Sequence, residues 1–439
     1  MRARRGPLTD VALVVPLLAA AAASYAVVGA DGRWLAAVGA RVAQGHLPDS
    51  LSFATAPTEG WPNAPALAEL LFHLLYAGLG ERGLIAAQVA AALVGYGALA
   101  LGLRREARST ASVFLVALLV LAGSLAAVLV VRNALFSLAL FPVLILIVEN
   151  DARAPSRRIW LVVPLLALWT NLHGSAVVGL VVLAAYVVLA RRRAAPVLVA
   201  GALALCATPL LLNTPRYYLA VAQNEAARRG VGLWASLGTG AFDLVYVVSA
   251  LALIAAALIS SRRMWRNWEL ACIAPLAIAS VHAARLGPWL LFIAAYPAVR
   301  AVDFRRPTAV PALVPLGLAV LAVVGLVHHP YDGGSRRLAS VAAALGRPVL
   351  ADGLLAEQVV IAGGTVWVAD PIEAFRHRDQ RLYLDWLAGN REGRAAVEHA
   401  ELVLVDRSSP AGHAAAHDAR LTVVSADRRA VLYRVGGSR

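Results

Sequence analysis

Residues 84–103 read LIAAQVAAALVGYGALALGL, a run of 20 residues without a charged side chain. A helix of about 20 apolar residues spans the hydrocarbon core of a bilayer. Comparable blocks recur along the 439-residue chain, which is 60% hydrophobic and has a mean hydropathy of +0.70, whereas soluble domains are about 45–50% apolar. The sequence therefore predicts a mainly α-helical polytopic membrane protein.

The apolar blocks predict about eleven transmembrane helices. The first block follows MRARR and is interpreted as an uncleaved span rather than a signal peptide, because its apolar run is long and many spans follow. The expected spans are 11–29, 84–103, 111–130, 134–148, 159–170, 175–190, 196–212, 242–259, 269–283, 287–302 and 309–327.

The distribution of basic residues predicts the orientation. The net charge is +14, and all 40 basic residues are arginine. Placing the N-terminus in the cytoplasm assigns eighteen arginines to the six inner segments and eight to the outer segments, as the positive-inside rule requires. Because these arginines lie at predicted membrane edges, we expect membrane lipids as neighbours and no nucleic-acid partner. The protein is expected in the cell membrane.

Two outer loops and a C-terminal domain complete the predicted organisation. Within the transmembrane domain, 1–327, the outer loops are 30–83 and 213–241, and the first contains an amphipathic pattern, ALAELLFHLLYAGLG, expected to lie on the outer surface. Residues 328–337 are interpreted as a linker. Residues 338–439 then predict a small extracytoplasmic α/β domain, with strands at 348–352, 365–370, 402–407, 421–426 and 430–435, the last two forming a hairpin.

Polar residues interrupt the apolar blocks at their predicted outer ends. The densest interruption, LWTNLHGSAVVGL, occupies residues 168–180. Polar groups that interrupt spans are candidates for function because they cost free energy in hydrocarbon unless they are paired or hydrated. The candidates are Asp31 and Trp34 after the first span, Arg132 and Asn133, Asn171 and His173, and His282 and Arg285.

Each candidate has a chemical and a structural interpretation. Asp31 is suited to act as a general base, or it is a solvated loop aspartate. Arg132 and Arg285 are suited to clamp a phosphate, or they extend to the membrane interface. Asn171 and His173 line a pocket, or they make interhelical hydrogen bonds.

The chain contains no P-loop, HExxH, CxxC pair or GxSxG motif. No ligand spacing requires a metal or another cofactor. A divalent ion at Asp31, with Asp49 or Glu69 as a second carboxylate, stays open as an alternative.

The order of these features resembles a large group of bacterial multi-pass proteins related to the GT-C class of membrane glycosyltransferases. That group carries an Asp and a Trp after span one, a glycine-rich stretch ending in Ser-Phe, a Trp-x-Asn element, an Arg before span four, a W-x-N-L-H-G motif, a Leu-Asn loop and a late Arg. The matching residues are Asp31, Trp34, Gly39, Gly45, Pro48, Ser52, Phe53, Trp61, Asn63, Arg132, Trp169, Asn171, His173, Gly174, Leu212, Asn213 and Arg285. They extend over nearly the whole chain.

This resemblance implies an enzyme that takes a sugar from a lipid-linked donor, such as a polyprenyl-phosphate sugar, at the outer membrane face. Asp31 matches the acidic residue that deprotonates the acceptor hydroxyl. Arg132 and Arg285 would bind the donor phosphate, and the pocket would be shaped by Trp34, Asn133, Asn171, His173 and His282. The acceptor would be an envelope glycan, lipid or protein, which the C-terminal domain would help to recognise.

Two alternatives remain at the level of sequence. A transporter or flippase for a lipid-linked sugar needs polar residues in both halves of the bilayer, whereas the interruptions here cluster on one face. A non-catalytic scaffold of GT-C type is favoured by the first outer loop, where LAAVG and APALAE stand at places at which the group carries histidine or acidic residues.

Overall fold

The computed structural model describes residues 8–10, 14–29, 31–58, 60–259, 265–304, 309–311, 313–328 and 333–436. The chain forms two compact units. The helical unit contains residues 1–28, 79–211 and 230–329, and the α/β unit contains residues 29–78, 212–229 and 330–439. The predicted linker falls partly outside the described residues, because 329–332 are not among them.

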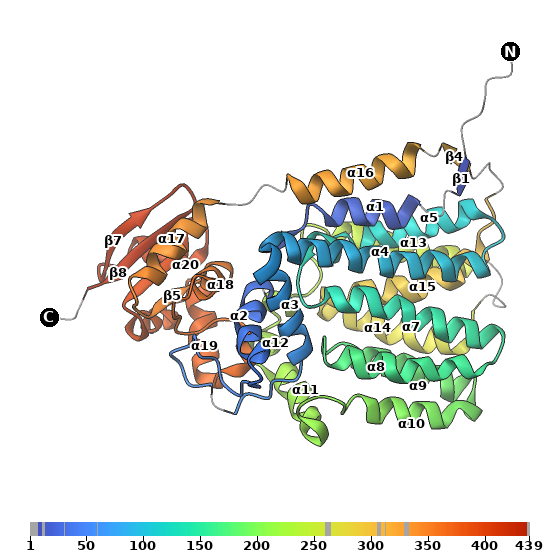
Figure 1. The fold of residues 1–439 in the computed structure, drawn as a ribbon, viewed down its shortest axis with the longest axis horizontal. Helices are drawn as coiled ribbons and strands as arrows, with labels where there is room; N and C mark the ends of the chain where they lie inside the picture. Colours follow the sequence, from blue (N-terminus) through green and yellow to red (C-terminus); the bar gives the residue numbers. More distant parts are fainter. Residues whose placement is uncertain are drawn as a thin grey trace, which may run out of the picture. The chain divides into compact units, whose positions relative to one another are not determined.

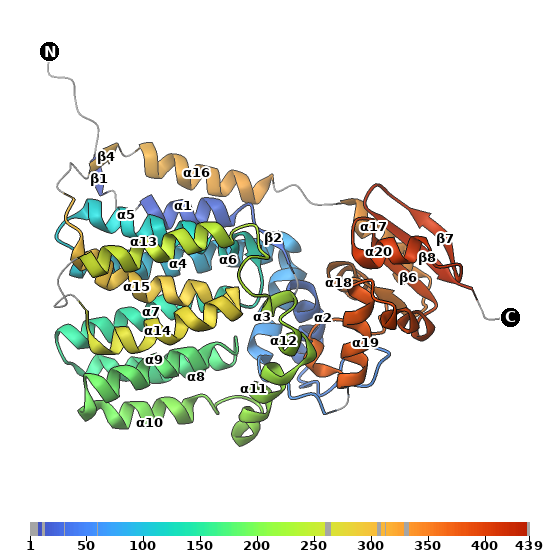
Figure 2. The same cartoon turned by 180° about the vertical axis from the view of Figure 1, so that it is seen from behind.

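The helical unit is a layered array of helices that run side by side (Figures 1 and 2). A helix overlaps each of the predicted spans. These helices are α1 (Val14–Ala23), α4 (Glu81–Glu106), α5 (Thr110–Gly123), α6 (Leu125–Leu129), α7 (Leu135–Arg153), α8 (Val162–Thr170), α9 (Ala176–Leu189), α10 (Ala195–Ala204), α13 (Asp243–Ile259), α14 (Asn267–His282), α15 (Gly287–Ala301) and α16 (Leu313–Val327).

Length and composition single out two of these helices. Among the described residues, α4 and α7 are long and apolar enough to cross a membrane, and they pack against each other. Gly95 of α4 permits this packing, because a Cβ there would overlap the carbonyl oxygen of Leu138. Several shorter helices are apolar as well, including α1, α5, α9, α13 and α16. Large apolar side chains remain exposed on α13 and α16, for example Leu244 and Leu313.

Two short strand pairs lie in the helical unit. Strand β1 (Leu8–Asp10) pairs antiparallel with β4 (Ala309–Pro311). Strand β2 (Val27–Val28) pairs in parallel with β3 (Val130–Val131), and Val28 lies opposite Val131. The strand that leads along the chain toward Asp31 therefore lies beside the strand that leads directly to Arg132.

The α/β unit contains a four-stranded sheet in the order β5-β6-β8-β7. Its strands are β5 (Val349–Ala351), β6 (Leu402–Asp406), β7 (Leu421–Ala426) and β8 (Ala430–Val435). Strands β5 and β6 are parallel, and β7 and β8 form the predicted hairpin, with a register shift between Val423 and Ser425. The strand expected at 365–370 is wrong in extent, because Val366 makes isolated bridges with Ala54 and Val349 instead.

The helices of this unit come from three separate stretches of chain. They are α2 (Gly32–Ala43) and α3 (Ala66–Leu79), α11 (Thr214–Gln223) and α12 (Glu225–Arg229), and α17 (Gly333–Ala344), α18 (Gly353–Ile361), α19 (His377–Leu387) and α20 (Pro410–Ala416). The amphipathic helix predicted at 66–80 is confirmed as α3. Helix α19 contains the sequence DQRLYLDWL.

Backbone and side-chain contacts join these stretches. The Val366 N–H donates to the Phe53 carbonyl, and the Val366 carbonyl accepts from the Thr55 N–H, both at 2.8 Å. In the second outer segment, the Glu225 N–H donates to Gln380 Oε1 at 2.8 Å. Both predicted outer loops thus contribute to the same compact unit as the C-terminal residues.

Candidate functional site

Asp31 lies at the start of α2 in an uncommon backbone conformation. Its φ is 95°, a region that residues other than glycine seldom occupy. Asp31 is the N-cap residue of α2, yet its side chain makes no capping hydrogen bond. The Glu357 carboxylate binds the helix start instead, because Oε1 accepts the Asp31 N–H at 2.7 Å and Oε2 accepts the Arg33 N–H at 3.3 Å.

Trp34 lies beside the Asp31 carboxylate and packs against Trp61. The indole Nε1–H of Trp34 donates to Asp31 Oδ1 at 3.3 Å. Trp34 is buried, and its ring meets that of Trp61 edge to face at a centroid distance of 6.1 Å. The predicted pocket residue Trp34 is thus brought to the predicted base.

Gly39 and Glu69 of the first loop fix the contact between α2 and α3. A Cβ at Gly39 would overlap the backbone carbonyl oxygen of Glu69, so only glycine permits this close approach. Asn63 Nδ2 donates to Glu69 Oε2 at 3.0 Å. Burial raises the pKa of the Glu69 carboxyl to about 7, and the hydrogen bond from Asn63 partly opposes this increase. Glu69 therefore favours its protonated form up to neutral pH.

Glu357 was missed by sequence reasoning. It lies on α18 and is fully buried. Burial raises its pKa well above the ordinary value and the charges of Asp370 and Asp31 raise it further, whereas the hydrogen bond from the Asp31 N–H and the charge of Arg33 oppose this increase and favour the carboxylate form, in which both oxygens accept backbone N–H groups. The available signal was a single acidic residue inside the apolar stretch GLLAEQVVI, since a buried carboxyl group needs partners.

Arg132 follows β3 and lies half-buried at the start of the turn before α7. Among the residues that the structure describes, its Nε finds no hydrogen-bond partner. The Arg132 and Asn133 carbonyls accept the N–H groups of Leu135 and Phe136 at 3.0 and 3.2 Å. The turn is therefore fixed through its backbone, while the Arg132 Nε is buried without a hydrogen-bond partner among the described residues.

The Trp169–His173 element forms a hydrogen-bond network. Trp169 Nε1–H donates to Ser137 Oγ at 2.8 Å. His173 Nδ1 lies 2.8 Å from the Ser137 hydroxyl oxygen and also from that of Ser175. The Ser175 backbone N–H donates to the same Nδ1 at 3.2 Å, so a neutral His173 carries its proton on Nε2. Removal from water lowers the His173 pKa, and the positive charge of Arg285 lowers it further.

Asn171 makes structural hydrogen bonds. Its Nδ2 donates to the carbonyls of Ala167 and Ala207, at 2.8 and 2.5 Å. These contacts join the end of α8 to the segment after α10. Asn171 thus holds these two segments together by hydrogen bonds.

Arg285 lies in the short 3-10 turn Ala284–Leu286, directly before α15. Its guanidinium carbon stacks 3.6 Å from the centroid of the Trp234 ring, a cation–π geometry. His282 is the last residue of α14, and its side chain is exposed. The electrostatic effect of Arg285 on His173 shows that these two candidates are neighbours within the helical unit.

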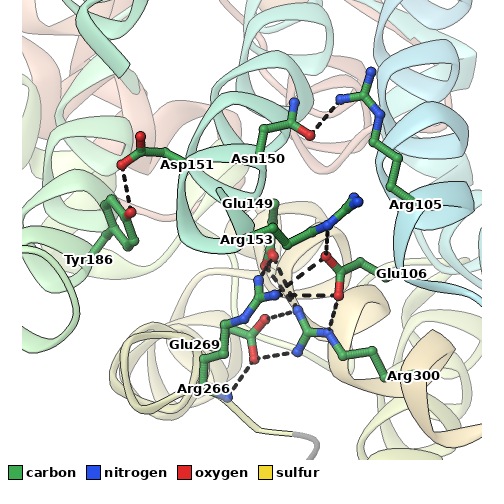
Figure 3. A network of polar contacts seen from close by, with 10 residues as sticks. All are labelled: Arg105, Glu106, Glu149, Asn150, Asp151, Arg153, Tyr186, Arg266, Glu269 and Arg300. Carbon is green, nitrogen blue, oxygen red and sulfur yellow. Dashed lines mark hydrogen bonds and ion pairs between the residues drawn. The ribbon is translucent and has the colours of Figure 1, made fainter. Parts of the chain in front are cut away.

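A second polar cluster, which the sequence analysis did not identify, lies at the helix ends that carry the predicted inner arginines (Figure 3). Arg300 is its centre and contacts Glu106 at 2.7 Å, Glu149 at 3.1 Å and Glu269 at 2.6 Å. Arg266 pairs with Glu149 and Glu106, and Arg153 approaches Glu106 at 3.5 Å. Three carboxylates thus balance three guanidinium groups from α4, α7, α15 and the start of α14.

The predicted site residues are distributed over both units. Asp31 and Trp34 belong to the α/β unit, whereas Arg132, Asn133, Asn171, His173, His282 and Arg285 belong to the helical unit. Among the described residues, no three His, Cys, Asp or Glu side chains are grouped so that they could hold a metal ion.

No protein-family model matches the chain, and no curated protein matches it. Solved structures are similar in fold. ArnT from Cupriavidus metallidurans bound to undecaprenyl phosphate aligns with a TM-score of 0.53 and 13% identity, covering 98% of each chain. The apo form of the same protein gives a TM-score of 0.54 at 13% identity and the same coverage.

A third solved structure, a mutant of the arabinofuranosyltransferase AftD from Mycobacteria, gives a TM-score of 0.49 and 16% identity. It covers 98% of this chain but 41% of the other. The likeness to ArnT over the whole chain supports a GT-C-like fold for this protein.

Proposed function

We propose that this protein is a membrane glycosyltransferase that moves a sugar from a polyprenyl-phosphate-linked donor to an envelope glycan, lipid or protein. The observation that carries the proposal is the geometry at Asp31, where a carboxylate precedes α2 without capping it and receives the Trp34 indole. The GT-C-like fold supports it, because ArnT with the same fold binds undecaprenyl phosphate.

In this proposal Asp31 is the general base. It removes the proton from the acceptor hydroxyl as that oxygen attacks the anomeric carbon of the sugar. The new glycosidic bond forms while the bond from the anomeric carbon to the phosphate oxygen breaks, and the polyprenyl phosphate leaves with the electron pair. Attack from the side opposite the leaving group inverts the anomeric centre.

Arg132 and Arg285 are the proposed phosphate ligands. The leaving phosphate gains negative charge as the bond breaks, and a guanidinium group stabilises that charge when it is already in position. The Arg132 Nε has no hydrogen-bond partner among the described residues. The stacking of Arg285 on Trp234 keeps its guanidinium oriented. His173, held neutral, contributes hydrogen bonds rather than charge.

The proposal includes the membrane arrangement. About eleven spans cross the cell membrane, the N-terminus lies in the cytoplasm, and the α/β unit lies outside. The W-x-N-L-H-G element supports the proposal that the chain belongs to the corresponding group of bacterial GT-C-like proteins. A divalent ion has no assigned part in the transfer step.

Native mass spectrometry and turnover assays test this function. Wild type, Asp31→Asn and the control Asp385→Asn are purified and mixed with a panel of undecaprenyl-phosphate sugars and an envelope acceptor extract. Asp385 is a carboxylate of the same unit and pairs with Arg229. We expect wild type and Asp385→Asn to bind and consume one donor, and Asp31→Asn to bind it without turnover. Donor binding without turnover by wild type would support a scaffold instead, and a folded, active Asp31→Asn would exclude the mechanism.

A further inference from the structure

The helix that begins at Asp31 is capped by a distant residue. The first N–H groups of any helix lack intrahelical partners, and an aspartate at the N-cap usually accepts them with its own carboxylate. Asp31 does not do so. Glu357, 326 positions later in the chain, accepts the N–H groups of Asp31 and Arg33.

We propose that Glu357 is a positioning residue for Asp31: by capping α2 in place of Asp31, it keeps the Asp31 carboxylate turned away from the helix start and directed toward substrate. This inference rests on the proposed role of Asp31 as the base. It also assigns a part in catalysis to α18, an element of the C-terminal stretch of chain.

The backbone of Asp31 supports this role. A φ of 95° costs a residue other than glycine about 1–3 kcal/mol and persists only when its surroundings hold it. The Asp31 N–H is held by the 2.7 Å bond to Glu357, while the carboxylate accepts the Trp34 indole N–H on the other side. Helices α2 and α18 lie side by side in both views (Figures 1 and 2).

Glutamine at position 357 would reproduce the shape of the side chain but not its acceptors. Its amide offers one oxygen and one NH2 group, so one of the two backbone N–H groups would face another donor. The Asp31 carboxylate is a replacement acceptor, because an aspartate at the N-cap position is well suited to capping. A carboxylate that accepts backbone N–H groups has a lowered pKa and is withdrawn from the acceptor hydroxyl.

Full-length wild type, Asp31→Asn, Glu357→Gln and Asp385→Asn are compared with the undecaprenyl-phosphate sugar that wild type consumes fastest. Asp385→Asn is a matched carboxylate-to-amide change in the same unit, at a residue bound to Arg229. We expect Glu357→Gln to lower kcat about 10- to 100-fold, because a positioned base contributes about 10²–10⁴-fold, with the donor KM within about twofold of wild type. The acid limb of its kcat–pH profile should move to lower pH.

Hydrogen exchange of peptides over 31–38 provides a readout without turnover. These amides should exchange faster in Glu357→Gln and as in wild type in Asp385→Asn. If Glu357→Gln fails to fold, Glu357→Asp is used instead, because it keeps the carboxylate on a side chain one methylene shorter. Its kcat, its kcat–pH profile and its hydrogen exchange are then measured. Unchanged exchange at the start of α2 would overturn the capping role.

The turnover results separate the two proposals. If Asp31→Asn is inactive while Glu357→Gln matches wild type in kcat and pH profile, the positioning role is overturned and the proposed function stands. If wild type consumes no donor, or Asp31→Asn stays active, the proposed function fails and the positioning role fails with it.

Discussion

Gly39 of α2 packs directly on the backbone carbonyl of Glu69 in α3, so closely that a Cβ would overlap the carbonyl oxygen. The Cβ of His73 would also lie 2.7 Å from the added carbon. Backbone atoms of a helix do not yield as a flexible side chain does. The two helices of the first outer loop are therefore held at a separation that only glycine permits.

Gly39→Ala should force α2 and α3 apart. Overpacking of this kind costs about 1–3 kcal/mol or more, and we expect a lower Tm together with faster hydrogen exchange in both helices. Gly78→Ala is the matched control, because nothing lies within 4 Å of a Cβ there and alanine favours a helix by up to about 1 kcal/mol. Equal Tm values for the two variants would contradict the close approach.

The ion-pair cluster around Arg300 predicts a large cost for neutralising one carboxylate. Glu269 is fully buried and pairs with Arg300 at 2.6 Å. Glu269→Gln removes one of the negative charges that neutralise Arg300. Loss of one partner of a buried ion pair lowers the free energy of unfolding by about 3–5 kcal/mol. Thermal unfolding in detergent measures the loss.

The exposed pair of Arg347 and Glu401, also 2.6 Å apart, provides the comparison. Exposed pairs contribute about 0–1 kcal/mol, so Glu401→Gln should change the Tm little. A Glu269→Gln protein as stable as Glu401→Gln would show that the cluster around Arg300 does not stabilise the helical unit.

Glu69 predicts a pH dependence of stability. Its pKa is raised from 4.5 to about 7 in the folded protein, so the folded state binds more protons than the unfolded state between these values. Stability therefore falls as the pH rises through this window, by about 3 kcal/mol in total. Glu69→Gln, which cannot ionise, should gain Tm relative to wild type between pH 4 and pH 8. A constant difference in Tm at the two pH values would count against the raised pKa.

A change at Arg132 should weaken donor binding, which can be measured separately from turnover. Arg132→Gln removes the proposed ligand of the donor phosphate, and we expect the donor KM to rise about 10-fold or more, since charge-assisted hydrogen bonds contribute about 1.5–3 kcal/mol. Arg347→Gln, at an exposed surface pair, should leave KM unchanged. Titration of each variant with undecaprenyl phosphate measures affinity without chemistry. An Arg132→Gln protein with wild-type affinity would remove Arg132 from the phosphate site.

Much of the fold could be predicted because its signals are local. The apolar block at 84–103 lies within α4, and the apolar runs at 402–407 and 430–435 correspond to strands β6 and β8. The segment at 365–370 misled the strand prediction because its partner, Ala54, lies in the first outer loop. A bridge between two residues about 300 positions apart in the sequence produces no periodic pattern in either segment.

The local contacts of the candidate site could be predicted, but its long-range contacts could not. Asp31 and Trp34 are close in sequence, and the structure joins them. The acceptor of the Asp31 N–H could not be read from a pattern, because Glu357 lies on α18 near the other end of the chain. His173 was singled out for its polarity, yet its partner Ser137 is an unremarkable hydroxyl in an apolar helix.

The division of the α/β unit among three stretches of chain has a consequence for how the protein is made. Residues 29–78 leave the ribosome early, but Val366, which Phe53 and Thr55 contact, and the helix that carries Glu357 are synthesised more than 270 residues later. Contacts of such long sequence separation form late. In the proposed topology, the first loop crosses the membrane before its C-terminal partners are synthesised. The geometry at Asp31 would then be completed only after Glu357 is made, so that a chain interrupted before α18 carries every helix of the helical unit and remains inert.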